Sequence, residues 1–224
     1  MARKALVVYG GWDGHQPREV AQLLVRTLRE DRFDVDLSDS LDALSDADRL
    51  TGLDLLVPHW TMGKIEDSKL NPVLDAVRAG RLNVAGCHGG MCDAFRENTE
   101  WHFMSGGQWV AHPGNDGTRY RVHVTDPRNP ITQGVADFDV SSEQYYMHVD
   151  PAVKVLATTR FPVADGPHVG NGPVDMPVLW TKLYGKGRVF YSSIGHQAST
   201  VAAEPHLTIM RRGFGWAAEG KKKM

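Results

Sequence analysis

The segment Gly86-Cys87-His88-Gly89-Gly90 places a histidine between glycines, directly after a short apolar run. Glycines around a central residue allow a sharp strand-to-helix turn that exposes one side chain above a sheet edge, where backbone N–H groups can face an oxyanion. Serine or cysteine is the usual nucleophile at such a turn, whereas histidine more often transfers protons or binds a metal. We therefore expect His88 to stand at such a turn, with its imidazole open to a cleft. Cys87 should point into the core, because strand side chains alternate between faces.

Other candidate groups are imidazoles and one carboxylate in loops or at the ends of predicted strands: His15, His59, His112, Glu143, His148 and His196. The carboxyl ends of parallel strands meet at one sheet edge, so His15, His59 and His88 should converge there. At least three of a second group should share one pocket: His88, His112, Glu143, His148 and His196. Imidazoles and a carboxylate can serve as general acids and bases, or can hold a divalent metal such as zinc. Metal-free proton transfer is favoured, because no HxH or HExxH motif occurs.

Four aromatic residues adjoin these polar groups: Trp12, Trp60, Trp109 and Tyr145. Aromatic faces beside hydrogen-bonding groups are what a sugar ring needs from a binding site. Core packing is the alternative interpretation of the same residues. With His15 and His59, we take these aromatic residues as candidates for substrate binding.

The composition indicates a globular protein of 224 residues, with 42% hydrophobic and 23% charged residues. A formal charge of −2 gives no field that would attract nucleic acid or a membrane surface, and the one basic run, Lys221-Lys222-Lys223, lies at the end. Cys87 and Cys92 do not have the spacing of a disulfide framework or a zinc knuckle. The first apolar run is too short for a signal peptide or a membrane span. These observations favour a cytoplasmic protein and leave the oligomeric state open, a homo-oligomer included.

The first ninety residues alternate strand and helix. Apolar runs at residues 5–9, 33–37, 53–57 and 83–87 read as strands buried on both faces. Helical spacing of apolar residues follows Pro17 and recurs at 66–79, with a more polar helical stretch between them. Such alternation with short connections predicts right-handed crossovers and an open parallel sheet with helices on both faces. Ligands bind such a sheet at its carboxyl edge.

The second half is predicted to be mainly β. Strand candidates lie at 119–124, 139–149, 153–159, 178–183 and 188–192, and a helix closes the chain at 204–218. We expect some of these strands to fold over the carboxyl edge of the parallel sheet. The glycine- and proline-rich loop at 161–176 is too short for an interdomain linker. A single domain over residues 1–224, with one continuous core, is the expected organisation.

Several motifs in this order resemble the ThuA-like (trehalose utilisation) family. They are the segments at 9–15, 60–63, 86–90, 106–113, 143–151, 177–180 and 184–196. The resemblance spans nearly the whole chain and implies the class I glutamine amidotransferase-like, flavodoxin-like fold, in agreement with the strand and helix pattern. It also implies that His88 stands where amidotransferases place their nucleophilic cysteine. Cys87 is one position away, and no His-x-Glu pair occurs late in the chain, so glutaminase activity is not expected.

The family resemblance implies a role in the use of disaccharides, particularly of 3-keto-glycosides. Such a sugar has an acidic proton beside its carbonyl and needs a base, an electrophile and aromatic walls. The first hypothesis is thus an isomerase or lyase in which Glu143 or His88 is the base and His112, His148 or His196 polarises the carbonyl or returns the proton. A metal-dependent enzyme for the same substrates is the first alternative. A non-catalytic sugar-binding or regulatory module is the second.

Overall fold

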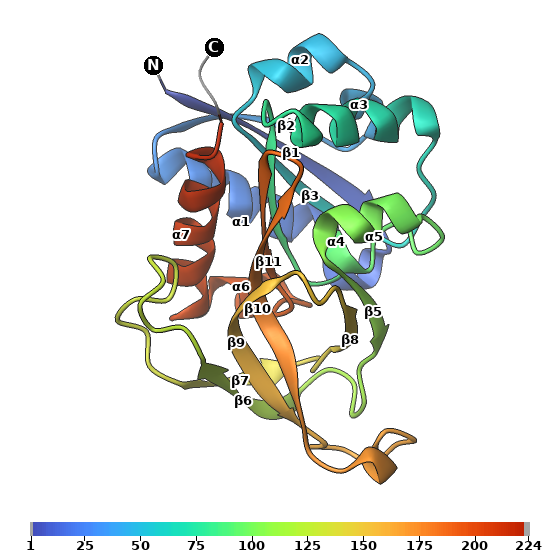
Figure 1. Ribbon diagram of the computed structural model, residues 1–224, viewed down its shortest axis with the longest axis vertical. Coiled ribbons are helices and arrows are strands. Elements are labelled where there is room, and N and C mark those ends of the chain that lie inside the picture. The colour runs from blue at the N-terminus through green and yellow to red at the C-terminus, as the bar shows by residue number, and fades with distance from the viewer. Residues whose placement is uncertain (1, 222–224) are drawn as a thin grey trace.

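The apolar runs of the first half form four parallel strands in a computed structural model, which describes residues 2–221 (Figure 1). Their bounds are β1 (Arg3–Gly11), β2 (Phe33–Ser38), β3 (Leu55–Thr61) and β4 (Asn83–Cys87). They lie in the order β2-β1-β3-β4, with β1 hydrogen-bonded to both β2 and β3. This arrangement confirms the predicted open parallel sheet and brings the ends of β1, β3 and β4 to one edge.

Helices connect and cover these strands (Figure 1). In chain order they are α1 (Pro17–Glu30), α2 (Ala47–Gly52), α3 (Asp67–Arg78), α4 (Gly89–Cys92), α5 (Thr99–Ser105), α6 (Ala198–Ala202) and α7 (His206–Ala218), with 3-10 turns η1 (Asp13–His15), η2 (Leu41–Leu44) and η3 (Val169–Asn171). Pro17 at the first turn of α1 suits a helix start, because its missing N–H would have had no partner there. Sequence analysis did not predict α5.

The second half continues the same sheet. The strand β11 (Gly187–Ser192) pairs in parallel with β4, and antiparallel strands β10 (Val174–Tyr184), β9 (Lys154–Phe161), β6 (Thr118–Val124) and β7 (Phe138–Ser142) follow outward. The complete order of the nine strands is β2-β1-β3-β4-β11-β10-β9-β6-β7. The fold is therefore a mixed α/β sheet that is parallel in its first half. These strands extend the sheet rather than fold over its edge.

A separate two-stranded ribbon pairs β5 (Gly107–Ala111) with β8 (Tyr146–Val149). The strand expected over residues 139–149 was wrong as a single element: it divides into β7 and β8, which belong to different sheets. The break between them falls at Glu143, Gln144 and Tyr145, whose side chains are buried. At these three residues the chain leaves the large sheet, and their side chains point into the interior of the protein.

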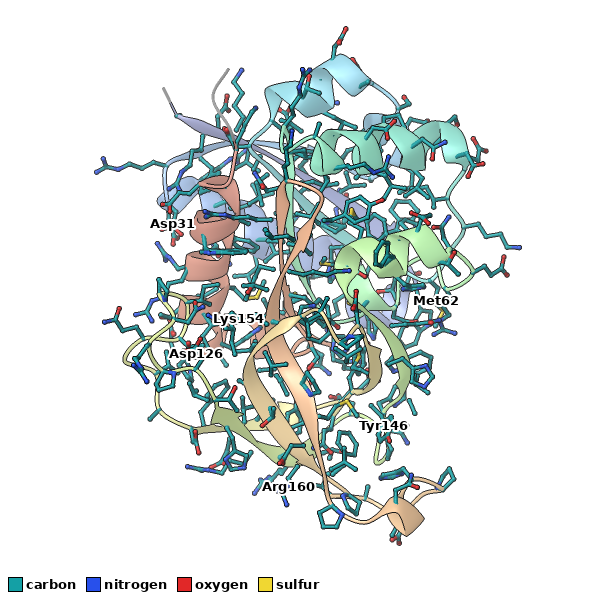
Figure 2. All side chains as sticks on the ribbon, viewed as in Figure 1. Asp31, Met62, Asp126, Tyr146, Lys154 and Arg160 are labelled. Atoms are coloured by element: carbon teal, nitrogen blue, oxygen red, sulfur yellow. The ribbon has the colours of Figure 1, made fainter. Side chains whose placement is uncertain are left out.

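Apolar side chains form a core on each face of the large sheet. One cluster joins β-strand residues to α1, α6 and α7, and the other joins the opposite face to α2, α3, α4 and α5. The expected continuous core is therefore divided in two, because the sheet itself separates the layers. At the periphery an ion pair of 3.1 Å between Lys154 and Asp126 ties the loop after β6 to β9 (Figure 2).

Among the described residues, no helix is both long and apolar enough to cross a membrane. Of the basic run at the carboxyl end, Lys222 and Lys223 lie outside the described residues. The ammonium group of Lys221 donates hydrogen bonds to the carbonyls of Thr51 and Leu53.

Candidate functional site

His88 stands between the end of β4 and the start of α4, as the glycine pattern predicted. Its backbone has φ 50° and ψ −144°, a conformation that non-glycine residues adopt only where the surrounding structure enforces it. Its N–H donates to the carbonyl of Ser192 at 2.7 Å, which links the turn to the end of β11. The imidazole is 1% exposed, so the expectation that it opens to a cleft was wrong. Other rings cover it.

Glycines beside the turn make room for those rings. A Cβ on Gly89 would lie 2.4 Å from Cε1 of His15, and a Cβ on Gly90 would lie 2.3 Å from Nδ1 of His59. A Cβ on Gly195 would lie 2.3 Å from Cβ of His88. These distances are too short for real contacts. The glycines are needed because the histidines pack directly on the backbone.

Glu143 lies at the centre of the site, in the buried segment between β7 and β8. Its Oε2 lies 3.1 Å from Nε2 of His88 and 3.6 Å from Nε2 of His15. Its Oε1 lies 3.4 Å from Nδ1 of His196 and 3.7 Å from Nε2 of His112. Each carboxylate oxygen is thus shared by two imidazoles. The cluster of His15, His88, His112, Glu143 and His196 is called the Glu143 cluster below.

Groups behind the cluster orient its rings. Nδ1 of His88 donates to the carbonyl of Ser193 at 2.9 Å, and Nδ1 of His15 is hydrogen-bonded to the hydroxyl of Thr61 at 2.9 Å. Nε2 of His196 lies 3.7 Å from a carboxylate oxygen of Asp116. Sequence analysis missed Thr61 and Asp116. Thr61 could have been found from its place at the end of β3. The segment Gly114-Asn115-Asp116-Gly117 is typical of a turn, but nothing in the sequence indicates that this turn reaches His196.

Aromatic rings border the Glu143 cluster. Tyr145 stacks on His88 with ring centroids 3.9 Å apart and is itself buried. Trp12 meets the edge of His15 at 4.8 Å and is 45% exposed. Trp109 lies 5.5 Å from the ring of His112. The guanidinium of Arg96 lies over Trp109 at 4.5 Å, a contact the sequence did not suggest.

Two predicted site residues, His148 and Trp60, lie away from the Glu143 cluster, whereas His59 packs behind it, near His15 and His88 as expected. His148 is exposed on β8 and, with His102 and Phe103, lines a different surface hollow. The prediction that His148 shares a pocket with Glu143 was therefore wrong. Trp60 packs over Gly10 and Gly63 rather than against the cluster. His59 is buried behind Gly90, and neither of its ring nitrogens has a hydrogen-bond partner among the described residues.

The electrostatics of the site follow from burial and from the crowding of its charges. Burial lowers the pKa of His88 to about 4, although its hydrogen bond to Glu143 acts in the opposite direction. Burial also lowers the pKa of His59 to about 3, and the charges of His15 and His88 lower it further. Burial alone would raise the pKa of Glu143, but its contacts with His15, His196 and His88 outweigh it and lower that pKa. The same carboxylate raises the pKa of His196. Glu143 is thus held as an anion, with His196 as its favoured cationic neighbour.

The family model described as trehalose utilisation, ThuA, matches residues 4–217. The chain belongs to the ThuA family. No curated protein matches the chain.

Solved structures share the fold of this ThuA-family chain. A protein from Parabacteroides merdae described as ThuA-like is 19% identical, with a TM-score of 0.75, and the alignment covers 100% of this chain and 93% of that one. A Salmonella typhimurium protein described as cytoplasmic is 16% identical, with a TM-score of 0.66 and coverages of 98% and 100%. A glutamine amidotransferase is 15% identical, with a TM-score of 0.53 and coverages of 97% and 98%.

Within this amidotransferase-like fold, the ThuA-family chain has no thiol in position to act as a nucleophile. Cys87 is 1% exposed, one position before the turn, and burial raises the pKa of its thiol to about 12. Burial also raises the pKa of Cys92. The chemistry available at the turn is therefore that of imidazole and carboxylate.

Proposed function

We propose that this chain is an enzyme of carbohydrate utilisation that moves a proton at the carbon beside the carbonyl of a keto-sugar, as an isomerase or lyase does. The observation that carries the proposal is the Glu143 cluster. A buried carboxylate in contact with imidazoles at 3.1–3.7 Å offers both proton-transfer groups and local positive charge. Such a combination suits a reaction in which an anionic enolate forms and decays.

His112 is the group proposed to carry the proton. Its side chain is 29% exposed, whereas those of His15 and His88 are 3% and 1% exposed, so a substrate reaches His112 first. A neutral His112 nitrogen takes the proton from the carbon, and the electron pair of that C–H bond shifts so that the carbonyl oxygen becomes an enolate. Positive charge held next to Glu143 stabilises that oxygen.

Two outcomes are open to the enolate, and neither needs an oxidant or a further reactant. Return of the proton to the other face or to the neighbouring carbon gives an isomer. If the adjacent carbon bears a glycosidic oxygen, loss of that group with the proton gives an unsaturated ketone and a free alcohol. Both reactions use the same first step, the transfer to His112.

The substrate class is supported by the family and by the aromatic border. The family description names trehalose utilisation. We take 3-keto-glycosides as the substrates, because an oxidised disaccharide of this kind has an acidic proton beside its carbonyl. Trp12 lies against His15 and Trp109 against His112, and a pyranose ring can pack on an indole face of this kind. The cleft that would hold the sugar remains a prediction. We also propose a cytoplasmic location and a small-molecule partner, in keeping with the description of the Salmonella neighbour.

The test is incubation of the purified protein with a panel of 3-keto-glycosides, with products separated and identified by mass and NMR. We expect conversion of at least one member and loss of conversion in Glu143→Gln. Binding of the sugars without conversion by any preparation would favour the sugar-binding module instead. Glutamine should not be hydrolysed, because the turn carries an imidazole and the cysteines are buried.

A further inference from the structure

The geometry points to a site for one divalent first-row transition metal, zinc or a similar ion, held by His15, His88, Glu143 and His196. One ligand atom from each of these residues lies within 4.8 Å of the others. They come from four separate parts of the chain, the ends of β1, β4, β7 and β11. The role of the ion in catalysis rests on the proposed function, whereas its binding does not.

Distances from the imidazoles to Glu143 are close to those between ligands of one ion. Two ligands at about 2.0–2.2 Å from a tetrahedral ion lie about 3.3–3.6 Å apart. Nε2 of His88 and Nε2 of His15 lie 3.1 and 3.6 Å from Oε2 of Glu143, and Nδ1 of His196 lies 3.4 Å from Oε1. The four ligand atoms lie within 4.8 Å of one another, so the side chains would have to draw together around a bound ion.

The hydrogen-bond roles leave lone pairs facing inward. A backbone carbonyl can only accept, so Nδ1 of His88 carries the proton in its bond to Ser193. In a neutral ring Nε2 then has no proton and turns a lone pair toward Oε2 of Glu143, 3.1 Å away. Two lone pairs at that distance repel unless a proton or a metal ion lies between them. A histidine whose second nitrogen donates to a carbonyl is the usual form of a metal ligand.

Two further nitrogens support the site independently. Nε2 of His15 and Nδ1 of His196 are buried and have no hydrogen-bond partner among the described residues. His15 is only 3% exposed, and its other nitrogen is already bonded to Thr61. Buried polar atoms are rarely left unpaired, so these two call for a ligand. Both lie beside the Glu143 carboxylate.

The donor set selects the kind of ion. Imidazoles with one carboxylate suit zinc and its neighbours, whereas magnesium and calcium prefer oxygen ligands. The thiols of Cys87 and Cys92 belong to the hydrophobic cores and contribute no sulfur. Nε2 of His112 lies 3.7 Å from Oε1 of Glu143, and the His112 side chain is more exposed than those of the proposed ligands. A carbonyl oxygen approaching from that side would meet the ion and His112 together.

The experiment measures metal binding by the full chain. Protein treated with a chelator is titrated with Zn²⁺ by calorimetry and with Co²⁺ by visible absorption. We expect one ion per chain and Co²⁺ bands of nitrogen and oxygen ligation. Glu143→Gln and His196→Gln should weaken binding by about tenfold or more, since the first removes the carboxylate charge and the second an imidazole ligand, and loss of an outer-shell partner alone costs about that much. The matched control is His123→Gln, since that exposed histidine pairs with Asp137 away from the site.

Each outcome bears on the inference. Absence of saturable binding by the wild-type chain, or binding unchanged in both ligand variants, would overturn the metal site. If a variant does not fold, the wild-type protein alone tests the site. Zinc should raise the melting temperature of the wild-type protein, because an ion that binds the native state stabilises it. The absence of a rise would contradict the site. Metal binding without turnover of any keto-sugar would remove the proposed function and keep the site. Unchanged turnover by protein that has lost its ion to the chelator would keep the proposed function and remove the role of the ion in catalysis.

Discussion

Nε2 of His88 lies 3.1 Å from Oε2 of Glu143, although 55 residues separate them in the chain. The contact joins a strained turn at the end of β4 to the buried break between β7 and β8. Both side chains are almost fully buried, so their interaction is not screened by solvent. The pair ties the His88 turn to the carboxylate that His15, His112 and His196 share.

Replacing His112 by glutamine should separate proton transfer from the rest of the site. Glutamine has a similar size but cannot accept a proton, so kcat for a keto-glycoside should fall by about 10²–10⁴ while the fold and bound metal are retained. The matched control is His148→Gln, because His148 is exposed on β8. A His112→Gln enzyme with normal kcat would assign the proton to another group.

Adding one methyl group at Gly195 should disturb the turn at His88. The new Cβ would lie 2.3 Å from Cβ of His88, so His88 or the backbone at Gly195, next to His196, must shift. A displacement of about 1 Å in a catalytic site can cost about 10²-fold in rate. We expect Gly195→Ala to lose activity on that scale. Gly52→Ala, where a Cβ meets nothing within 4 Å, should keep full activity and shows whether the effect is specific.

The strands of the first half should be costly to truncate. Leu55 is 0% exposed in β3, and Leu55→Ala should lower the free energy of unfolding by about 2–5 kcal/mol in urea denaturation. Leu183 on β10 is 62% exposed, and Leu183→Ala should change the free energy of unfolding by less than about 0.5 kcal/mol. Equal effects of the two changes would contradict the assignment of the core.

These strands could be predicted because buried parallel strands are apolar on both faces, and that pattern is visible in the sequence. The site was predicted in part. His15, His88, His112, Glu143 and His196 converge, because the strand order brings their loops together. That the chain forms one domain remains a prediction, which the sharing of one large sheet by both halves supports.

His148 could have been excluded from the sequence. Side chains of a strand alternate, so Glu143 and His148, five residues apart, would point to opposite faces of one continuous strand. The actual break at 143–145 was beyond sequence reasoning, since it depends on tertiary partners: the imidazoles around Glu143 and the Thr159 hydroxyl that accepts from Gln144. The partner groups Thr61 and Asp116 were missed for the same reason: their roles depend on tertiary contacts.

Stability should depend on pH through His206, which is buried and hydrogen-bonded to Ser192 through Nε2. Burial lowers its pKa from 6.5 to about 4, although the carbonyls of Val201 and Thr200 and the charge of Glu204 act in the opposite direction. Between about pH 6.5 and 4 the unfolded chain therefore binds a proton that the native chain does not. Stability falls as the pH falls through this window, by on the order of 3 kcal/mol in total from this residue.

The check is urea denaturation of the wild-type protein and His206→Gln at pH 7.5 and 5. Glutamine does not titrate, so the difference in stability between the two proteins should be smaller at pH 5. A difference that is the same at both pH values would show that His206 is not held neutral in the native state.

The central claim is that the Glu143 cluster labilises the proton beside the carbonyl of a keto-sugar. Its most direct test is NMR of a 3-keto-glycoside in deuterated water with catalytic amounts of the protein. We predict that the signal of the C–H beside the carbonyl disappears at a rate proportional to the concentration of wild-type protein. With Glu143→Gln the rate should fall by about 10²-fold or more toward that of the buffer. Exchange at the buffer rate with the wild-type protein, or equal exchange with both proteins, would contradict the account.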